Sequence, residues 1–151
     1  MDTRRNYMQV NTPRFQGICA EAKTKAKLDD FEVREMTVRG NLAIVSIPKV
    51  PLKDSDRMVL VIATNALNNG IIFEDKEMKF AKNLGKTPAI IQSGRFTVAL
   101  NNKNASALKA YALDMSGERI AEIPVKVKNG KAVISIDTAK TPAVYFELTA
   151  N

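Results

Sequence analysis

The chain has 151 residues, of which 45% are hydrophobic and 26% are charged, and its formal net charge is +7. This balance is typical of one soluble globular domain. It excludes disordered and collagen-like chains, and no apolar run approaches the ~18 residues of a membrane-spanning helix. The sequence has no His or Trp and one cysteine, Cys19, which excludes histidine bases, an internal disulfide and a cysteine-rich metal site.

The hydrophobic pattern indicates β-strands along nearly the whole chain. Segment 20–28 is the one stretch with good helix propensity, but it has almost no apolar face, so a short helix there stays an alternative. Segments 42–47 and 59–63 are continuous apolar runs rich in β-branched residues, which is typical of central strands. The second run is expected to be covered on both faces of its sheet. Polar loops are expected at 64–70, 74–87 and 101–106.

Two later segments alternate between apolar and polar residues, which predicts strands with one face in solvent. In the first, Phe96, Val98 and Leu100 are expected to face the core. The second, residues 144–149, has the same pattern with Glu147 and Thr149 on the solvent face.

Two hairpins are predicted near the C-terminus. Asn129-Gly130 separates two alternating runs, and both residues tolerate the positive φ of a type I′ turn. A second hairpin is expected from 108–113 through a turn at 114–117 to 119–123. About ten short strands at this spacing predict an all-β fold: a single antiparallel β-sandwich, jelly-roll or Ig-like, over residues 1–151.

Close carboxylate pairs are candidate catalytic residues, because two carboxylates suffice for glycoside cleavage. The pairs are Asp29 with Asp30, Asp54 with Asp56, and Glu74 with Asp75. Each lies in a predicted loop or at a strand end, where solvated turn residues are the ordinary interpretation. The chain is therefore expected not to be an enzyme by itself, and to need no cofactor or metal.

Basic residues concentrate in the second half of the chain. Such a patch could attract nucleic acid or an acidic polysaccharide. The lysines are not interleaved with aromatic residues, so a solubilising surface is favoured over nucleic-acid binding. The residues are Lys76, Lys79, Lys82, Lys86, Arg95, Lys103 and Lys109.

Cys19 stands among small apolar residues and is expected to be buried filling. A cluster of Asn and Phe residues is the candidate sugar site, because amides donate to and accept from sugar hydroxyls and a ring can stack on a sugar face. Turn formation is the competing interpretation of these Asn residues. The candidates are Asn65, Asn68, Asn69, Phe73, Phe80 and Asn83.

Several segments, in chain order, are similar to motifs of one family. Thr12-Pro13-Arg14-Phe15-Gln16-Gly17 resembles a Thr-Pro-Arg-Thr-Gln-Gly motif, and Asn68-Asn69-Gly70-Ile71-Ile72-Phe73 resembles an Asn-Thr-Gly-Met-x-Trp loop. Leu84 to Pro88 resembles a Trp-Gly-Thr-Gly-Pro segment at Gly85 and Pro88 alone, and residues 108–125 resemble the closing strands. The family is the C-terminal β-sandwich that follows the catalytic barrel in some bacterial clan A-like glycoside hydrolases. Phe15, Phe73 and Leu84 depart from its pattern.

The resemblance implies a non-catalytic carbohydrate-associated module of a polysaccharide-degrading enzyme. It would bind plant polysaccharide weakly at the Asn and Phe cluster, or brace the catalytic barrel, and its partners would be a polysaccharide or oligosaccharide and that barrel, not nucleic acid or membrane. It also implies a secreted or cell-surface protein, although residues 1–7 lack the apolar stretch of a signal peptide. The alternative is a purely structural or protein-interaction sandwich without glycan affinity.

Overall fold

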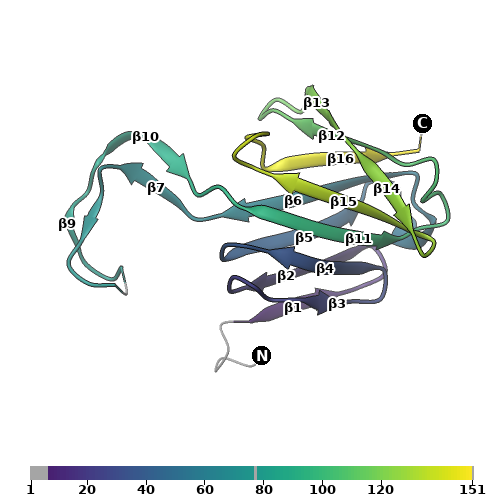
Figure 1. Cartoon of the computed structure of the whole chain (residues 1–151), viewed down its shortest axis with the longest axis horizontal. Coiled ribbons are helices and arrows are strands. Elements are labelled where there is room, and N and C mark those ends of the chain that lie inside the picture. Colours follow the sequence, from purple (N-terminus) through teal and green to yellow (C-terminus); the bar gives the residue numbers. More distant parts are fainter. Residues whose placement is uncertain (1–6, 77, 151) are drawn as a thin grey trace.

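The computed structural model describes residues 7–76 and 78–150. Figure 1 shows two stacked β-sheets and a long arm that projects from one end of them. All paired strands are antiparallel, so the predicted all-β antiparallel sandwich is confirmed. The described residues form sixteen strands rather than about ten, because the arm and several turns contain short strands of their own.

The larger sheet has seven strands and contains both ends of the described chain. In spatial order its strands are β1 (Met8–Asn11), β2 (Phe15–Ala20), β5 (Gly40–Ser46), β6 (Arg57–Thr64), β16 (Tyr145–Thr149), β12 (Lys109–Leu113) and β13 (Arg119–Ile123). A single 3-10 turn, η2 (Leu52–Asp54), lies between β5 and β6.

The second sheet has five strands and covers one face of the first (Figure 1). Its order is β14 (Val125–Lys128), β15 (Lys131–Asp137), β11 (Arg95–Asn101), β4 (Phe31–Met36) and β3 (Ala26–Lys27). The core lies between the sheets, and its largest fully buried side chains include Phe31, Phe96 and Phe146. Phe96, Val98 and Leu100 are buried as the alternation predicts, and Ala99 is buried as well.

β6 alternates between the core and a second, partly open face. Met58, Leu60 and Ile62 are buried in the core, whereas Val59 and Val61 are half-buried on the outer face. The expectation that this strand is covered on both faces is therefore wrong for the described chain. Its apolar outer face is left without a covering layer.

Segment 20–28 is not helical. Ala20 ends β2, a turn follows, and β3 begins at Ala26. The absence of an apolar face explains this, because packing rather than propensity stabilises most helices.

The Asn129-Gly130 hairpin is confirmed. Lys128 pairs with Lys131, and φ is 52° at Asn129 and 73° at Gly130. The second hairpin, β12 to β13, is also as predicted. Its turn is held by the Asp114 carboxylate, which accepts hydrogen bonds from the Ser116 hydroxyl and the Glu118 N–H.

Replacing Gly130 with valine should lower the melting temperature by about 3 °C, because a β-branched residue at this positive φ costs on the order of 1 kcal/mol. A Cβ at Gly130 would meet no atom within 4 Å, so the cost comes from the backbone and not from a clash. Gly130→Asn should lose less, since Asn tolerates this conformation. Thermal unfolding measures both, and equal losses would show that φ is not the cause.

The prediction for β16 is wrong at its polar residues. Glu147 and Thr149 point to the outer face, as expected, but they are only 5% and 4% exposed. Arg57 on the neighbouring β6 and Arg119 on β13, two strands away, cover Glu147. An alternating pattern assigns a side chain to a face, and it does not report what covers that face.

The arm comprises residues 65–92, between β6 and β11. Its strands are β7 (Ala66–Asn69), β8 (Ile72–Phe73), β9 (Ala81–Asn83) and β10 (Lys86–Ile91), with β7 paired to β10 and β8 paired to β9. The expectation of polar loops at 64–70 and 74–87 is therefore wrong over these strands. The arm is closed at its base, where the Gln92 N–H donates to the Asn65 carbonyl at 2.8 Å.

The Thr12–Gly17 motif links the two sheets through side-chain hydrogen bonds. The Gln16 side chain is fully buried, and its Oε1 accepts hydrogen bonds from the N–H groups of Asp30 (3.0 Å) and Phe31 (2.9 Å) at the start of β4. Gly17 lies so close to β5 that a Cβ would stand 2.8 Å from the Ala43 Cβ. The motif therefore fixes how β2 meets both its neighbour and the opposite sheet.

Candidate functional site

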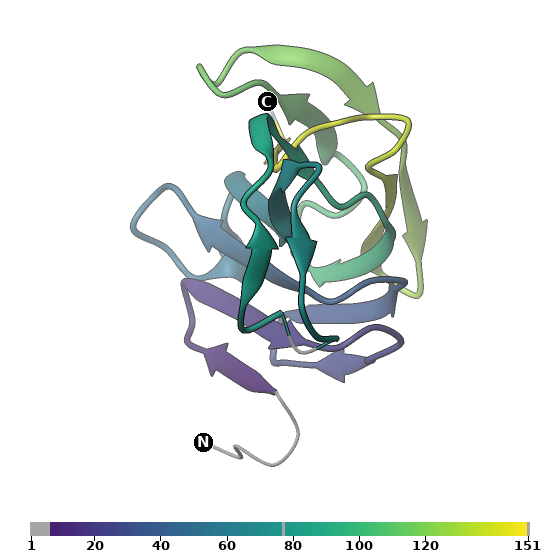
Figure 2. The same cartoon turned by 90° about the vertical axis from the view of Figure 1, so that its left-hand side faces the viewer.

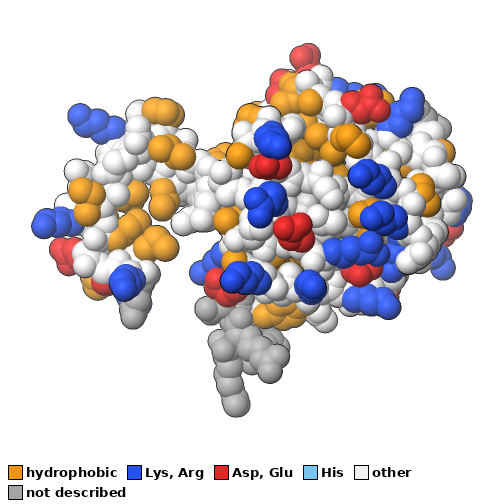
Figure 3. Space-filling model, viewed as in Figure 1, with side chains coloured by type: hydrophobic (Ala, Val, Ile, Leu, Met, Phe, Trp, Pro, Cys, Tyr) orange, Lys and Arg blue, Asp and Glu red, His pale blue; other side chains and the backbone are white. Residues whose placement is uncertain are grey.

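A groove separates the arm from the end of the sandwich. It has a volume of about 820 Å³. In Figure 2 the arm stands in front of the sandwich end, and Figure 3 shows hydrophobic side chains gathered along the inner side of the arm. The groove therefore has one wall from the arm and one from the sandwich.

The sandwich wall carries charged and amide groups beside the apolar Ala22, Val38 and Ala63. It comes from the β2–β3 turn, the β4–β5 turn and the outer face of β5, where Asn41 is the cross-strand partner of Cys19 and of Ala63. Glu21 and Arg39 form an ion pair of 3.5 Å on this wall, and both side chains are about half exposed. The wall thus offers a carboxylate, a guanidinium and an amide to a ligand.

The arm wall is mostly apolar. Leu67, Phe73 and Met78 face the groove, with Asn65 and Gln92 at the base of the arm. A smaller hollow of about 450 Å³ continues along the arm. It is lined by Asn65, Leu67, Asn68, Gly70, Ile71, Met78, Ile90 and Gln92.

The six candidate site residues all lie on the arm. Three of them line the groove or the smaller hollow, and the other three do not. Asn65 and Phe73 line the groove, and Asn68 lines the smaller hollow. Asn69, Phe80 and Asn83 are exposed on the arm outside both linings.

Two of the candidate amides shape the arm itself. The Asn68 Nδ2 donates to the Leu84 carbonyl at 3.0 Å, and the Asn83 Oδ1 accepts from the Gly85 N–H at 2.9 Å. Gly85 has φ 68°, and a Cβ there would lie 2.6 Å from the Asn69 carbonyl oxygen. These contacts support turn formation as one role of Asn68 and Asn83.

Sequence reasoning missed Glu21, Arg39 and Asn41 of the sandwich wall, and Gln92 at the base of the arm. These residues lie in separate turns and strands, and no local motif connects them. Cys19 was expected to be buried filling, but it is half-buried on the outer face of β2 and lines the groove. Successive side chains of β2 alternate between the core and the outer face, and Cys19 is one of those on the outer face.

The acid pairs have ordinary surface partners where the structure shows them. Asp54 lies 3.9 Å from the Lys103 Nζ, and Asp30 accepts a hydrogen bond from the Asn101 amide at 3.0 Å. Residues 7–76 and 78–150 contain no group of three or more His, Cys, Asp or Glu side chains that could hold a metal ion. The same residues include no helix that is long and apolar enough to cross a membrane.

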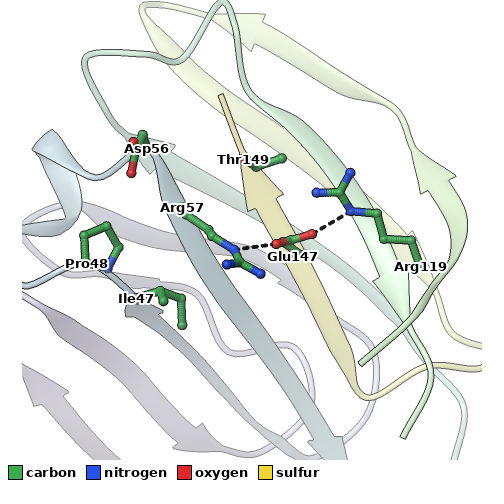
Figure 4. Close-up of a pocket in the computed structure, with 7 residues that line it drawn as sticks. All are labelled: Ile47, Pro48, Asp56, Arg57, Arg119, Glu147 and Thr149. Carbon is green, nitrogen blue, oxygen red and sulfur yellow. Dashed lines mark hydrogen bonds and ion pairs between the residues drawn. The ribbon is translucent and has the colours of Figure 1, made fainter. Parts of the chain in front are cut away.

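The outer face of the seven-stranded sheet carries a cluster of three charged residues, Arg57, Glu147 and Arg119 (Figure 4). The Glu147 Oε1 accepts from Arg57 Nε and its Oε2 from Arg119 Nε, both at 2.7 Å. Arg119 also lies over the Tyr111 ring, 4.2 Å from its centroid. Burial raises the pKa of the Glu147 carboxyl, but the hydrogen bonds and charges of Arg119 and Arg57 outweigh it and hold the pKa below its usual range.

This lowered pKa predicts a loss of stability in acid. Glu147 prefers its charged form when folded, so its contribution is present above the ordinary carboxyl pKa and is lost as the pH falls through the lower, folded pKa. Glu147→Gln should therefore flatten the dependence of unfolding free energy on pH below about 4.3. Denaturant titrations from pH 6 to 2 measure this, and the exposed Glu118→Gln is the control. An unchanged slope in Glu147→Gln would contradict the expectation.

Comparison of the chain with models of protein families, with curated proteins and with solved structures found no match.

Proposed function

We propose that this chain is a non-catalytic carbohydrate-associated β-sandwich module of a polysaccharide-degrading enzyme, and that the groove between arm and sandwich holds a segment of the polysaccharide. The proposal joins the family resemblance of the motifs to one structural observation, the amphipathic lining of the groove. As part of such an enzyme the chain would be secreted or held at the cell surface.

The lining of the groove suits a sugar. A sugar ring has an apolar face and a rim of hydroxyls, so it needs an apolar surface beside polar donors and acceptors. Phe73 and Leu67 supply the apolar surface on the arm, and Asn41, Asn65 and the Glu21–Arg39 pair supply the polar groups. Both walls are attached to a rigid sandwich, which reduces the entropy lost on binding.

Affinity should be modest. The chain has no Trp, and Phe73 is the one aromatic residue in the lining of the groove. We expect a Kd of about 0.1–1 mM, or ~4–5.5 kcal/mol.

The test is affinity electrophoresis in gels containing xylan, mixed-linkage glucan, soluble cellulose derivative, mannan or pectin. The chain should be retarded by at least one of them, and Phe73→Ala and Asn65→Ala should each abolish that retardation. Phe80→Ala and Asn69→Ala are matched controls, because they make the same changes on the arm outside the groove, and they should keep it. Retardation by none of the gels, or equal loss in the controls, would refute the groove as the site.

The same samples should release no reducing sugar. The three close acid pairs lie in turns and bends, where Asp54 is ion-paired with Lys103 and Asp30 accepts a hydrogen bond from the Asn101 amide, and this is not the setting of a glycosidase pair. Reducing-sugar release that is abolished by one Asp→Asn or Glu→Gln change would contradict the non-catalytic assignment.

Bracing of a catalytic barrel is the second candidate function, and the outer face of the seven-stranded sheet favours it. Phe15, Val45, Val59, Glu147 and Tyr111 are successive cross-strand partners, so they form one row across five strands. Apart from Glu147 these side chains are apolar or aromatic, and they are only partly buried. The five-stranded sheet instead presents charged residues to solvent (Figure 3).

A covering protein would bury this row. With the barrel present, Val59 and Tyr111 should become protected from solvent, while the groove variants Phe73→Ala and Asn65→Ala should leave the contact intact. This outcome, without retardation in any gel, would select bracing over sugar binding.

A further inference from the structure

The Arg57–Glu147–Arg119 cluster has unused hydrogen-bonding capacity. Each arginine donates to Glu147 through Nε alone, and the structure gives the four terminal nitrogens no partner among residues 7–76 and 78–150. The Glu147 side chain is 6% exposed, whereas the side chains of Arg57 and Arg119 are 61% and 47% exposed. One buried carboxylate thus holds two open guanidiniums in place.

The guanidiniums border a hollow of about 450 Å³ on the outer sheet face. Figure 4 shows Arg119 on one side, Ile47, Pro48 and Asp56 on the other, and Arg57 between them. Thr149 completes the lining, and its cross-strand partners are Arg57 and Lys109. The hollow is therefore cationic on one side and carries an apolar surface and a carboxylate on the other.

This distribution does not suit a simple anion, which Asp56 would repel. It suits a ligand with a carboxylate at one end and hydroxyl donors at the other. Guanidinium nitrogens bind a planar carboxylate through paired hydrogen bonds, and a carboxylate such as Asp56 accepts bonds from hydroxyls. Ile47 and Pro48 offer an apolar surface for a ring between the two.

We propose that this hollow binds a uronate residue of an acidic polysaccharide, with its carboxylate on Arg57 and Arg119 and its hydroxyls toward Asp56. The net charge of +7 attracts a polyanion over long range and adds to this preference. The site extends the proposed function to a second location and shares no residue with the groove, so each can fail without the other.

Glu147 is a positioning residue in this site. Both of its oxygens are occupied by Nε groups, so it turns the terminal nitrogens of both arginines toward the hollow. If the cluster served only to hold β6, β16 and β13 together, the chain would bind uronates and neutral sugars with the same affinity.

The test is an NMR titration of the whole chain with galacturonate and glucuronate, and with galactose and glucose as neutral matches. Uronates should shift the signals of Arg57 and Arg119 side chains and bind at least tenfold more tightly than the neutral sugars. Acetate and sulfate should bind more weakly than the uronates, because they lack the ring and hydroxyls. Binding of galactose or acetate as tight as that of galacturonate, or no uronate binding at millimolar concentration, would overturn the proposal.

Variants separate the site from the stability of the sheet. Arg57→Gln and Arg119→Gln should each weaken uronate binding about tenfold. Arg34→Gln, which removes a guanidinium bonded to Glu32 on the other sheet, should leave it unchanged. Asp56→Asn leaves the arginine pairs intact and should weaken uronate binding, whereas acetate should bind more tightly because the charge that repels it is gone. If Asp56→Asn leaves the affinity for uronate as unchanged as Arg34→Gln does, the hollow is not the site.

Discussion

Replacing Phe146 with alanine should lower the free energy of unfolding by about 3–5 kcal/mol. Phe146 is fully buried on β16, between β6 and β12, and is among the largest side chains of the core. The change removes a ring from a position where neighbouring strands cannot move inward, so both apolar burial and packing are lost. Chemical denaturation monitored by circular dichroism measures the difference.

Phe80→Ala is the matched control for this prediction. The Phe80 side chain is 66% exposed on the arm, and the same substitution there should change the unfolding free energy by less than about 0.5 kcal/mol. A large loss in Phe80→Ala would mean that the arm packs against the sandwich more closely than the structure shows. A small loss in Phe146→Ala would contradict the position of the core.

Gln16→Ala should lower the free energy of unfolding by about 3 kcal/mol, which is a large loss for a polar residue. The change would leave the N–H groups of Asp30 and Phe31 without an acceptor near the core, and each such loss costs ~1–3 kcal/mol. The loss also removes a direct link between the two sheets, because β2 and β4 belong to different sheets.

Gln9→Ala tests the same substitution on the neighbouring strand. Gln9 is exposed on β1, and its side chain accepts a hydrogen bond from the Tyr7 hydroxyl alone among the contacts described. Gln9→Ala should change the free energy of unfolding by less than about 0.5 kcal/mol. If the two variants lose similar amounts, the buried amide does not hold the sheets together.

Local patterns predicted those parts of the fold that local chemistry determines. The Asn129-Gly130 turn requires positive φ at two positions, and this pair tolerates it, so the hairpin was readable from two residues. Alternation likewise placed Phe96, Val98 and Leu100 in the core. The covering of Glu147 could not be read in this way, because Arg57 and Arg119 reach it from strands distant in sequence.

The candidate site was predictable on the arm and not on the sandwich. Asn65 and Phe73 were chosen for their chemistry in one segment, and they line the groove. The opposite wall, with Arg39 and Asn41, comes from another part of the chain, and only the packing of β5 beside β6 brings it there. β7 and β9 lie in segments predicted as polar loops, because strands with exposed side chains lack the apolar alternation that predicts a half-buried strand.

The closed base of the arm has a consequence for how this protein can change during evolution. Gln92 bonds back to Asn65, so the chain leaves the sandwich and returns to it at the same point. Residues added to or removed from the arm beyond that bond would not disturb the register of β6 or β11, and lengthening a loop whose ends are fixed costs little entropy. The arm can therefore vary in length and sequence between descendants of this chain while the sandwich stays constant.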